Sequence, residues 1–241
     1  MGQMVDRRDW LRERRAAVEA SYDAEAPSYD ENPYPVETQV RFVERLVATC
    51  PPGGMVLDAP CGTGQYFALV AAAGRRVVGI DQSAGMLAQA QARDIAVALH
   101  QVGLQELAFE GEFDAAMTVD AMENVFPEDW PTVLVNLSRA VRPDGHLYLT
   151  VEEVPETVLD EAFADLSARG LPAVRGEVIE GDVAGYHFYP GRDQVMRWLE
   201  AAGLAIVEQE TETLEDWGYW HILVGAHRGI GPLGPGRTSS P

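Results

Sequence analysis

The fold is decided by one short stretch of the chain, Met55-Val56-Leu57-Asp58-Ala59-Pro60-Cys61-Gly62-Thr63-Gly64. Its first three residues are apolar and predict a short buried strand, which Asp58 ends. Gly62 and Gly64 predict a turn whose backbone can approach a ligand closely, because glycine carries no Cβ atom. Apolar residues then recur at helical spacing, so a helix is expected over 65–73. A strand, a glycine turn and a helix N-terminus in this order form a cradle for a nucleotide-type ligand at the carboxyl edge of a parallel sheet.

Two kinds of ligand use such a cradle, and the turn distinguishes them. Dinucleotide sites carry G-x-G-x-x-G and hold a pyrophosphate at the helix N-terminus. Gly62 and Gly64 fit the first two glycines, but the third falls on Phe67. The loop also holds an acid, Asp58, and no cation, which favours a ligand with a positive centre over a pyrophosphate. An NAD(P)-dependent oxidoreductase is therefore the less favoured alternative.

The same loop resembles motif I, usually written D-x-G-x-G-x-G, of class I S-adenosylmethionine (SAM)-dependent methyltransferases. SAM bears an ammonium and a sulfonium and has no phosphate. The resemblance implies SAM as the cofactor, held in part by Asp58, Ala59, Pro60, Gly62 and Gly64. The chain departs from the family at Pro60, where glycine is most common. Because proline fixes φ near about −65°, the turn must be made by the later glycines.

A second acid ends the next expected strand. The apolar run over 76–81 closes with Asp81, which lies 19 residues beyond Gly62. An acid at this distance meets the ribose hydroxyls in nucleotide-binding βαβ units. The alternative role, capping the following helix, suits Ser83 better. Asp81 is therefore expected to bind the ribose.

Four further residues are assigned to the cofactor by resemblance alone. Gln82 is assigned to the cofactor without a specific contact, and Met86 lies near where such relatives pack apolar side chains on the adenine. A third strand is expected over 96–101, and Leu104 and Gln105 follow it, where relatives often carry an aspartate that bonds the adenine amine. Since neither residue is acidic, a backbone group or the Gln105 amide is expected to make that contact.

The N-terminal region carries a second resemblance. The segment Tyr22-Asp23-Ala24-Glu25-Ala26-Pro27-Ser28-Tyr29-Asp30 is similar to the "YD…A..YD" lead-in of many small-molecule methyltransferases of this class. The resemblance implies that residues 1–50 form a helical segment covering the cofactor, with Tyr29 near its methionine part. Tyr22 is the weaker candidate. A helix–linker–helix whose tyrosines only pack is the alternative.

The fourth expected strand, over 113–119, points to the acceptor side of the site. It ends at Asp120, which faces the cradle because ligands of doubly wound sheets bind at the carboxyl ends of strands. Asp120 is therefore counted with the cofactor-binding residues. Glu123 follows where related enzymes often have histidine, and it is a candidate catalytic residue. Capping of the next element is an equally good explanation of Glu123.

An aromatic-rich run over 185–189 is expected to wall the acceptor pocket. His187, within this run, is the first candidate for a general base, although a packing or hydrogen-bonding histidine is the open alternative. Tyr186, Tyr189 and Trp220 are assigned to acceptor binding, which indicates an apolar or ring-bearing small molecule. Core packing explains such aromatic residues equally well.

The order of elements predicts the fold class. Strands and helices alternate up to about residue 152, which predicts a parallel sheet, and two strand-like runs over 204–210 and 219–226 suit the end of the family's sheet. The expected fold is α/β, a Rossmann-like doubly wound seven-stranded sheet, mostly parallel with an antiparallel C-terminal strand and helices on both faces. The SAM-binding domain is expected over 51–228, with an acceptor-site insertion at about 154–190. The Gly-, Pro- and Ser-rich tail, 229–241, is expected to be disordered.

The amino-acid composition restricts the kinds of partner and of chemistry expected for the chain. The net charge of −20 argues against nucleic acid, and all 18 basic residues are arginine, so lysine chemistry is excluded. Cys50 and Cys61 lack metal-site spacing, so no metal is expected. No apolar run is long enough to span a membrane, and no signal peptide is recognised, so a cytoplasmic protein without a membrane partner is expected. The sequence does not decide between a monomer and a homodimer.

These observations together predict an enzyme. It is expected to transfer the methyl group of SAM to O, N or C of a small-molecule acceptor, with a secondary metabolite among the candidates. The two alternatives are the NAD(P)-dependent oxidoreductase and a non-catalytic SAM-binding protein.

Overall fold

The computed structural model describes residues 5–31, 37–180 and 185–226. Its helices, three of them short 3-10 turns labelled η, are α1 (Arg7–Glu25), η1 (Tyr29–Glu31), α2 (Glu37–Thr49), α3 (Phe67–Ala72), α4 (Ala84–Ala92), η2 (Leu104–Glu106), η3 (Met122–Asn124), α5 (Trp130–Ala140), α6 (Glu156–Ala168) and α7 (Arg192–Ala201). Its strands are β1 (Met55–Asp58), β2 (Arg76–Asp81), β3 (Ala98–Gln101), β4 (Phe113–Thr118), β5 (Val141–Glu153), β6 (Glu177–Glu180), β7 (Gly185–Phe188), β8 (Leu204–Leu214) and β9 (Trp217–Ala226).

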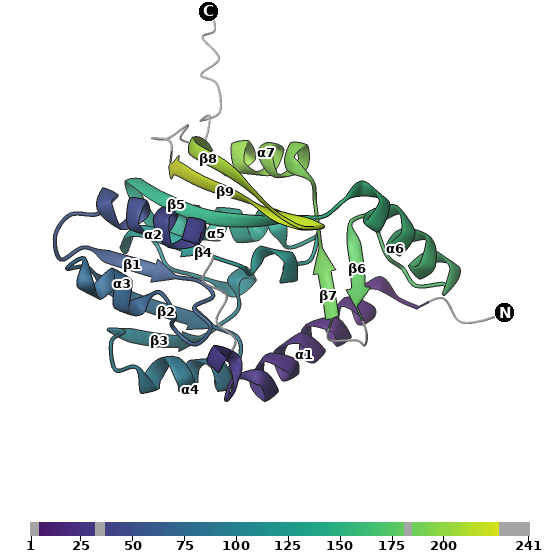
Figure 1. Cartoon of the computed structure of the whole chain (residues 1–241), viewed down its shortest axis with the longest axis horizontal. Coiled ribbons are helices and arrows are strands. Elements are labelled where there is room, and N and C mark those ends of the chain that lie inside the picture. The colour runs from purple at the N-terminus through teal and green to yellow at the C-terminus, as the bar shows by residue number, and fades with distance from the viewer. Residues whose placement is uncertain (1–4, 32–36, 181–184, 227–241) are drawn as a thin grey trace, which may run out of the picture.

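Seven of these strands form one sheet in the order β3-β2-β1-β4-β5-β9-β8 (Figure 1). Strand β1 lies between β2 and β4, because Leu57 pairs in parallel with Val78 on one side and Ala116 on the other. Parallel pairing continues outward to β3 and β5. Strand β9 runs antiparallel to both β5 and β8. The expected fold class is confirmed, including the single antiparallel strand.

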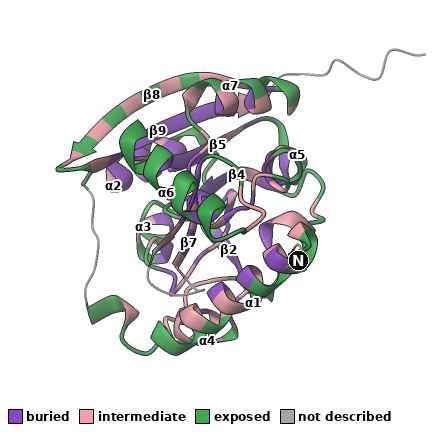
Figure 2. Cartoon of the chain, turned by 90° about the vertical axis from the view of Figure 1, so that its right-hand side faces the viewer, coloured by how far each residue is buried: buried purple, intermediate pink, exposed green. Residues whose placement is uncertain are grey.

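Alternating side chains divide the core into two layers. On β1, Val56 faces a cluster with helices α2 and α3, whereas Leu57 faces a second cluster with α5 and α7. Both side chains are fully buried, as a central strand covered on both faces requires. Figure 2 shows the inner strands as buried and β8, at the edge, as a mixture of intermediate and exposed positions.

The region expected to be an irregular insertion is partly regular. Helix α6 is followed by an antiparallel hairpin of β6 and β7, which lies beside α1 (Figure 1). The fully buried carboxylate of Glu177 fastens it, because it accepts hydrogen bonds from Tyr186 Oη at 2.7 Å and Val174 N at 2.7 Å and pairs with Arg7 at 2.9 Å.

Strand β5 begins at Val141, which pairs with Phe113 of β4, and the register of the two strands shifts between Phe113 and Ala115. The tail over 229–241 lies outside the described residues. In the described part of the chain, no helix is both long and apolar enough to cross a membrane.

Candidate active site

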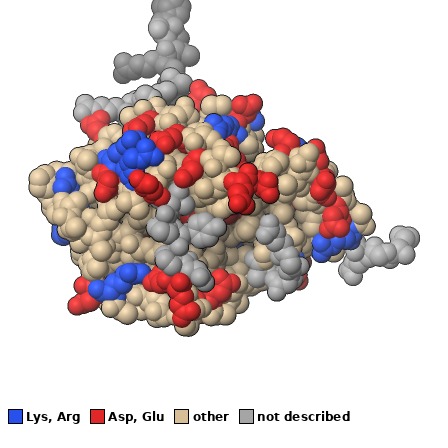
Figure 3. Space-filling view, viewed as in Figure 1, with Lys and Arg blue, Asp and Glu red and all other residues tan. Residues whose placement is uncertain are grey.

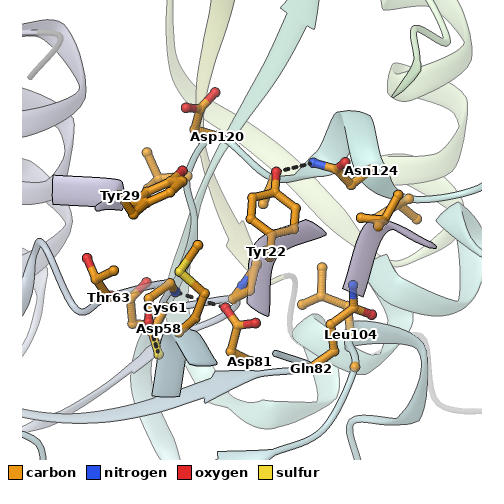
Figure 4. A pocket seen from close by; sticks show the side chains of 18 of the residues that line it. Tyr22, Tyr29, Asp58, Cys61, Thr63, Asp81, Gln82, Leu104, Asp120 and Asn124 are labelled. Atoms are coloured by element: carbon orange, nitrogen blue, oxygen red, sulfur yellow. Dashed lines mark hydrogen bonds between the residues drawn. The ribbon is translucent and has the colours of Figure 1, made fainter. Parts of the chain in front are cut away.

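The carboxyl ends of β1, β2 and β4 border one cavity of about 420 Å³. Asp58, Asp81 and Asp120 line it from these three strands, and α1 and η1 cover it from the N-terminal side. Figure 4 shows Asp81, Gln82 and Leu104 at one end, here called the β2 end, and Asp120 and Asn124 at the other, here called the β4 end.

The glycine turn builds the floor of the cavity. Gly62 and Gly64 have φ of +51° and +80°, so the later glycines make the turn, as Pro60 requires. A Cβ added at Gly62 would meet no heavy atom within 4 Å, whereas one at Gly64 would lie 2.6 Å from the Phe67 ring. Gly62 and Pro60 border the cavity. Gly64 and the buried Ala59 do not, so these two support the turn from behind.

Asp81 joins the turn to the end of β2. Its Oδ2 accepts from Gly62 N at 2.9 Å and its Oδ1 from Ser83 N at 2.9 Å. Burial raises the pKa of Asp81, while these backbone hydrogen bonds act against that shift. Ser83 caps α4, accepting from Met86 N at 3.0 Å, so the capping role falls on Ser83 as expected. Carboxylate lone pairs remain for vicinal hydroxyls on the cavity side.

Asp58 is more deeply buried than Asp81, and its carboxylate has fewer hydrogen-bond partners among the described residues. Its Oδ2 is buried and has no hydrogen-bond partner among the described residues. Burial, and next the charge of Asp81, raise the pKa of Asp58 well above its ordinary value. A buried carboxylate oxygen without a partner is costly in free energy. A donor or cation supplied by a ligand would satisfy it.

The β2 end forms a mostly apolar slot. Met86 and Leu104 are buried, and Gln82 and Gln105 lie beside them on the cavity wall. The Nδ2 atom of Asn136 donates to the carbonyl oxygens of Leu104 and Gln105, both at 3.1 Å, which fixes this part of the wall. The structure thus brings together the four residues that the resemblance alone assigned to the cofactor.

The N-terminal lead-in is fastened over the cavity by its two aspartates. Asp23 Oδ1 accepts from Ser83 Oγ at 2.6 Å and from Gly85 N at 2.8 Å. Asp30 Oδ1 accepts from Thr63 Oγ1 at 2.7 Å, and its Oδ2 accepts from Arg93. The tyrosine that precedes each aspartate, Tyr22 or Tyr29, borders the cavity instead. Each Tyr-Asp pair therefore combines one cavity residue with one fastening residue.

Burial also acts on the two tyrosines. It raises the pKa of Tyr29 to about 12, with a further contribution from the charge of Asp120. The pKa of Tyr22 is raised for the same first reason, and next by Glu123. Both hydroxyls are therefore neutral donors at physiological pH.

Asp120 is the accessible acid of the β4 end. Its backbone, at φ of +53°, donates to Thr150 Oγ1 at 2.7 Å, and its carboxylate accepts from Tyr219 Oη. Burial of the site raises the pKa of Asp120, against the effects of the Tyr219 hydrogen bond and of the charge of His187. A carboxylate with a raised pKa is suited to accept a proton near neutral pH.

The two residues expected to be catalytic lie behind this wall. Glu123 is buried and does not border the cavity; its Oε1 accepts from Asn124 Nδ2 at 2.8 Å, and Asn124 also donates to Tyr22 Oη at 3.2 Å. Burial and the charge of Asp120 raise the pKa of Glu123 well above its ordinary value. His187 is half-buried on β7, 3.1 Å from Tyr189 Oη through its Nδ1 atom. It also lies off the cavity wall.

The three aromatic residues assigned to the acceptor do not border the cavity, which corrects their expected position. Tyr186 is fully buried beside the Trp10 and Phe126 rings, at 6.1 and 4.8 Å between centroids. Tyr189 packs in a small cluster under α6. Trp220 donates to Gln209 Oε1 at 2.8 Å across β8 and β9. Aromatic residues in a sequence do not indicate which cavity, if any, they face.

Several other residues border the cavity that the sequence did not indicate as site residues. Gln39 and Tyr66 border the cavity beside Asp58, and Arg15 and Phe126 border it near α1. The spacing of apolar residues in α2 does indicate which face of the helix Gln39 lies on. It lies three, four and seven residues before apolar positions of α2, so it belongs to the helix face that packs on the sheet.

Comparison with known proteins agrees with this geometry. A family model described as a methyltransferase domain matches residues 56–145. The demethylmenaquinone methyltransferase of Clavibacter sepedonicus is 26% identical over 239 residues, covering 93% of this chain and 94% of the relative. The malonyl-[acyl-carrier protein] O-methyltransferase of Serratia marcescens is 32% identical over 135 residues, or 54% of this chain and 51% of that protein.

Solved structures show the same fold. The 1,6-didemethyltoxoflavin-N1-methyltransferase of Burkholderia thailandensis, solved with its acceptor and S-adenosylhomocysteine, has a TM-score of 0.66 at 18% identity, with 94% of this chain and 93% of that chain covered. The matched domain spans the glycine turn, Asp81 and Asp120, which are the residues that shape the cavity. The chain is therefore an enzyme, a SAM-dependent methyltransferase with a Rossmann-like fold, and its cofactor is S-adenosylmethionine.

Proposed function

We propose that the enzyme methylates a small molecule held at the β4 end of the cavity. One observation carries this proposal: the cavity continues past the acids of β1 and β2 to Tyr22, Tyr29 and Asp120 (Figure 4). The relatives named above act on a demethylmenaquinone, a malonyl carrier protein and 1,6-didemethyltoxoflavin, as their names state. Nothing in the comparisons supports the oxidoreductase or the non-catalytic alternative.

The residues fit the cofactor. Asp58 offers an unpartnered buried oxygen to a cation, Asp81 faces the cavity where ribose hydroxyls would bind, and Gly62 leaves open space for the ligand. Bound SAM supplies an activated methyl group on a sulfonium, so the protein needs no nucleophile of its own. Its remaining tasks are to orient the acceptor, exclude water and hold a proton.

We infer that Asp120 receives that proton. When bound, SAM would supply the methyl group to the acceptor atom, and its sulfur would keep the electron pair of the broken sulfur–carbon bond. The acceptor's own proton then passes to the Asp120 carboxylate, which Tyr219 orients through its hydrogen bond. His187 acts on Asp120 through its charge, and Glu123 orients Asn124 toward Tyr22.

The charge of the cavity indicates the class of acceptor. Among the described residues that border it, five are acids and only Arg15 is basic. Arg15 is already paired with Asp129. Figure 3 shows that acidic side chains also outnumber basic ones on the outer face. Because such a field repels anions, the acceptor is neutral or cationic, which favours amines and neutral hydroxyl compounds over carboxylates and phosphates.

A methyl-transfer screen tests the proposal. Matched amines, phenols and carboxylic acids of similar size are incubated with the enzyme and SAM, and methylated products are detected by mass spectrometry. We expect products from neutral or cationic acceptors only. Turnover of the carboxylates alone would contradict the charge argument, and no turnover of any class would favour a non-catalytic SAM-binding protein. Residence in the cytoplasm, the absence of a nucleic-acid partner and the monomer-or-homodimer alternative stay predictions.

A further inference from the structure

Two buried polar atoms of residues on the cavity wall have no hydrogen-bond partner within the described part of the chain, and they are of opposite kinds. One is Asp58 Oδ2, an acceptor, and the other is Gln39 Nε2, a donor. The two residues are only 1% and 2% exposed, and both border the cavity. Buried polar atoms are normally paired, so two orphans in one wall point to a ligand that would pair with both.

Tyr66 connects the two. Its hydroxyl donates to Gln39 Oε1 at 3.0 Å, which occupies the amide oxygen and leaves the amide nitrogen as the unpartnered donor of this cavity-lining residue. After burial, the charge of Asp58 is the largest influence on the Tyr66 hydroxyl, whose pKa it raises, so the carboxylate lies near the phenol. Asp58, Tyr66 and Gln39 therefore form one polar patch, here called the Gln39 patch, built from β1, the glycine turn and α2.

The ligand that fits this patch has a positive and a negative group close together. Asp58 needs a donor or cation, whereas Gln39 needs an acceptor or anion. No arginine of the described cavity wall is free for the anion, because Arg15 pairs with Asp129. An α-amino acid zwitterion meets both needs at once, and SAM carries one at its methionine end.

We propose that Gln39 binds the carboxylate of the cofactor's amino acid while Asp58 binds its ammonium, so that the Gln39 patch selects the zwitterion. This inference rests on the use of SAM and not on the identity of the acceptor. A failed acceptor screen would leave it intact, and its own failure would leave methyl transfer intact.

The test compares two ligands that differ only at this end. S-adenosylhomocysteine has the amino acid, and 5′-methylthioadenosine has the adenosine and sulfur without it. Binding of both is measured by calorimetry for the parent, Gln39→Met and Gln39→Glu. We expect Gln39→Met to weaken S-adenosylhomocysteine on the order of 10-fold, because one hydrogen bond to a charged group is lost. The loss for Gln39→Glu is larger, because two carboxylates then oppose each other. Affinity for 5′-methylthioadenosine changes less than about 3-fold in both variants.

Gln105→Met is the matched control. It makes the same change at the β2 end, and both ligands carry the adenosine, so it is expected to affect them equally. If Gln39→Met is poorly folded, Tyr66→Phe gives the same selectivity with a smaller effect, since it frees the amide without removing it. Equal changes for both ligands at Gln39, or none for S-adenosylhomocysteine, would overturn the proposal.

Discussion

The two glycines of the turn are expected to serve different purposes, and alanine substitutions distinguish them. Gly62, Gly64 and the surface Gly74 have φ of +51°, +80° and +73°. Alanine at any of them therefore carries a left-handed backbone cost of roughly 1–2 kcal/mol. The three positions differ in surroundings. A Cβ at Gly64 would lie 2.6 and 2.7 Å from ring carbons of Phe67, whereas at Gly62 or Gly74 it would meet nothing within 4 Å.

This difference fixes the expected magnitudes. The Phe67 ring is fully buried and cannot move aside freely, so Gly64→Ala adds an overpacking cost of roughly 1–3 kcal/mol. We expect Gly64→Ala to lose about 2–5 kcal/mol of unfolding free energy, against about 1–2 kcal/mol for the other two variants. Urea unfolding followed by tryptophan fluorescence measures these losses.

Ligand binding separates the remaining pair. Gly62 borders the cavity, so its new methyl group occupies space left for the cofactor, whereas Gly74 lies outside the cavity wall. Gly62→Ala should weaken S-adenosylhomocysteine on the order of 10-fold or more, while Gly74→Ala binds as the parent does. The reasoning is refuted if Gly64→Ala is as stable as Gly74→Ala, or if Gly62→Ala binds with parental affinity.

Four further variants test the charges of the site and the fastening of the lead-in. Asp58→Asn should weaken S-adenosylhomocysteine on the order of 10-fold or more. Because burial raises the pKa of Asp58, its contribution to stability is present below the ordinary carboxyl pKa of 3.8 and is lost as pH rises through the folded value. Unliganded Asp58→Asn should therefore be more stable than the parent near neutral pH, as thermal unfolding across pH would show. Tyr219→Phe and His187→Ala each remove an influence that lowers the pKa of Asp120, so the acidic limb of the kcat profile should move to higher pH. In both the Tyr219→Phe and the His187→Ala variant, turnover should fall far more than SAM affinity. Equal losses of turnover and affinity would contradict the role of Asp120 as proton acceptor. Asp30→Ala unfastens the lead-in and should speed the release of S-adenosylhomocysteine about 3- to 10-fold in stopped-flow measurements.

The glycine turn and the two acids at the edge of the sheet could be predicted because their signals are local. An apolar run, an acid and two glycines within ten residues specify a strand, a turn and a helix, and they leave few alternatives. The spacing from Gly62 to Asp81 covers one helix and one strand, so it places the second acid at the same sheet edge. The resemblance to the methyltransferase family, with its order of strands, then predicted the rest of the sheet, including the antiparallel β9.

The acceptor half could not be predicted, because its signals are tertiary. Tyr186 and Trp220 are bulky aromatic residues, yet their hydroxyl and indole groups donate to Glu177 and Gln209 away from the cavity. Which side of an element faces a cavity depends on neighbours distant in the sequence. The β6–β7 hairpin lies beside α1, more than 150 residues earlier, and no local pattern records that contact.

We infer that the Gln39 patch serves to bind a ligand and not to stabilise the fold. Measurements of thermal stability with and without ligand distinguish these two roles. A side chain kept for folding loses stability when it is replaced, with or without ligand. Gln39 instead leaves a buried donor unpaired in the free protein, which costs about 1–3 kcal/mol. A double variant, Gln39→Met with Tyr66→Phe, removes the orphan donor together with the hydroxyl that donates to Gln39 Oε1, and it should leave the unliganded melting temperature unchanged or higher. The same variant should gain less from S-adenosylhomocysteine than the parent does at equal concentration, because stabilisation follows affinity. Opposite signs in these two measurements identify a residue selected for its ligand, whereas a fall in both would identify one that the core requires.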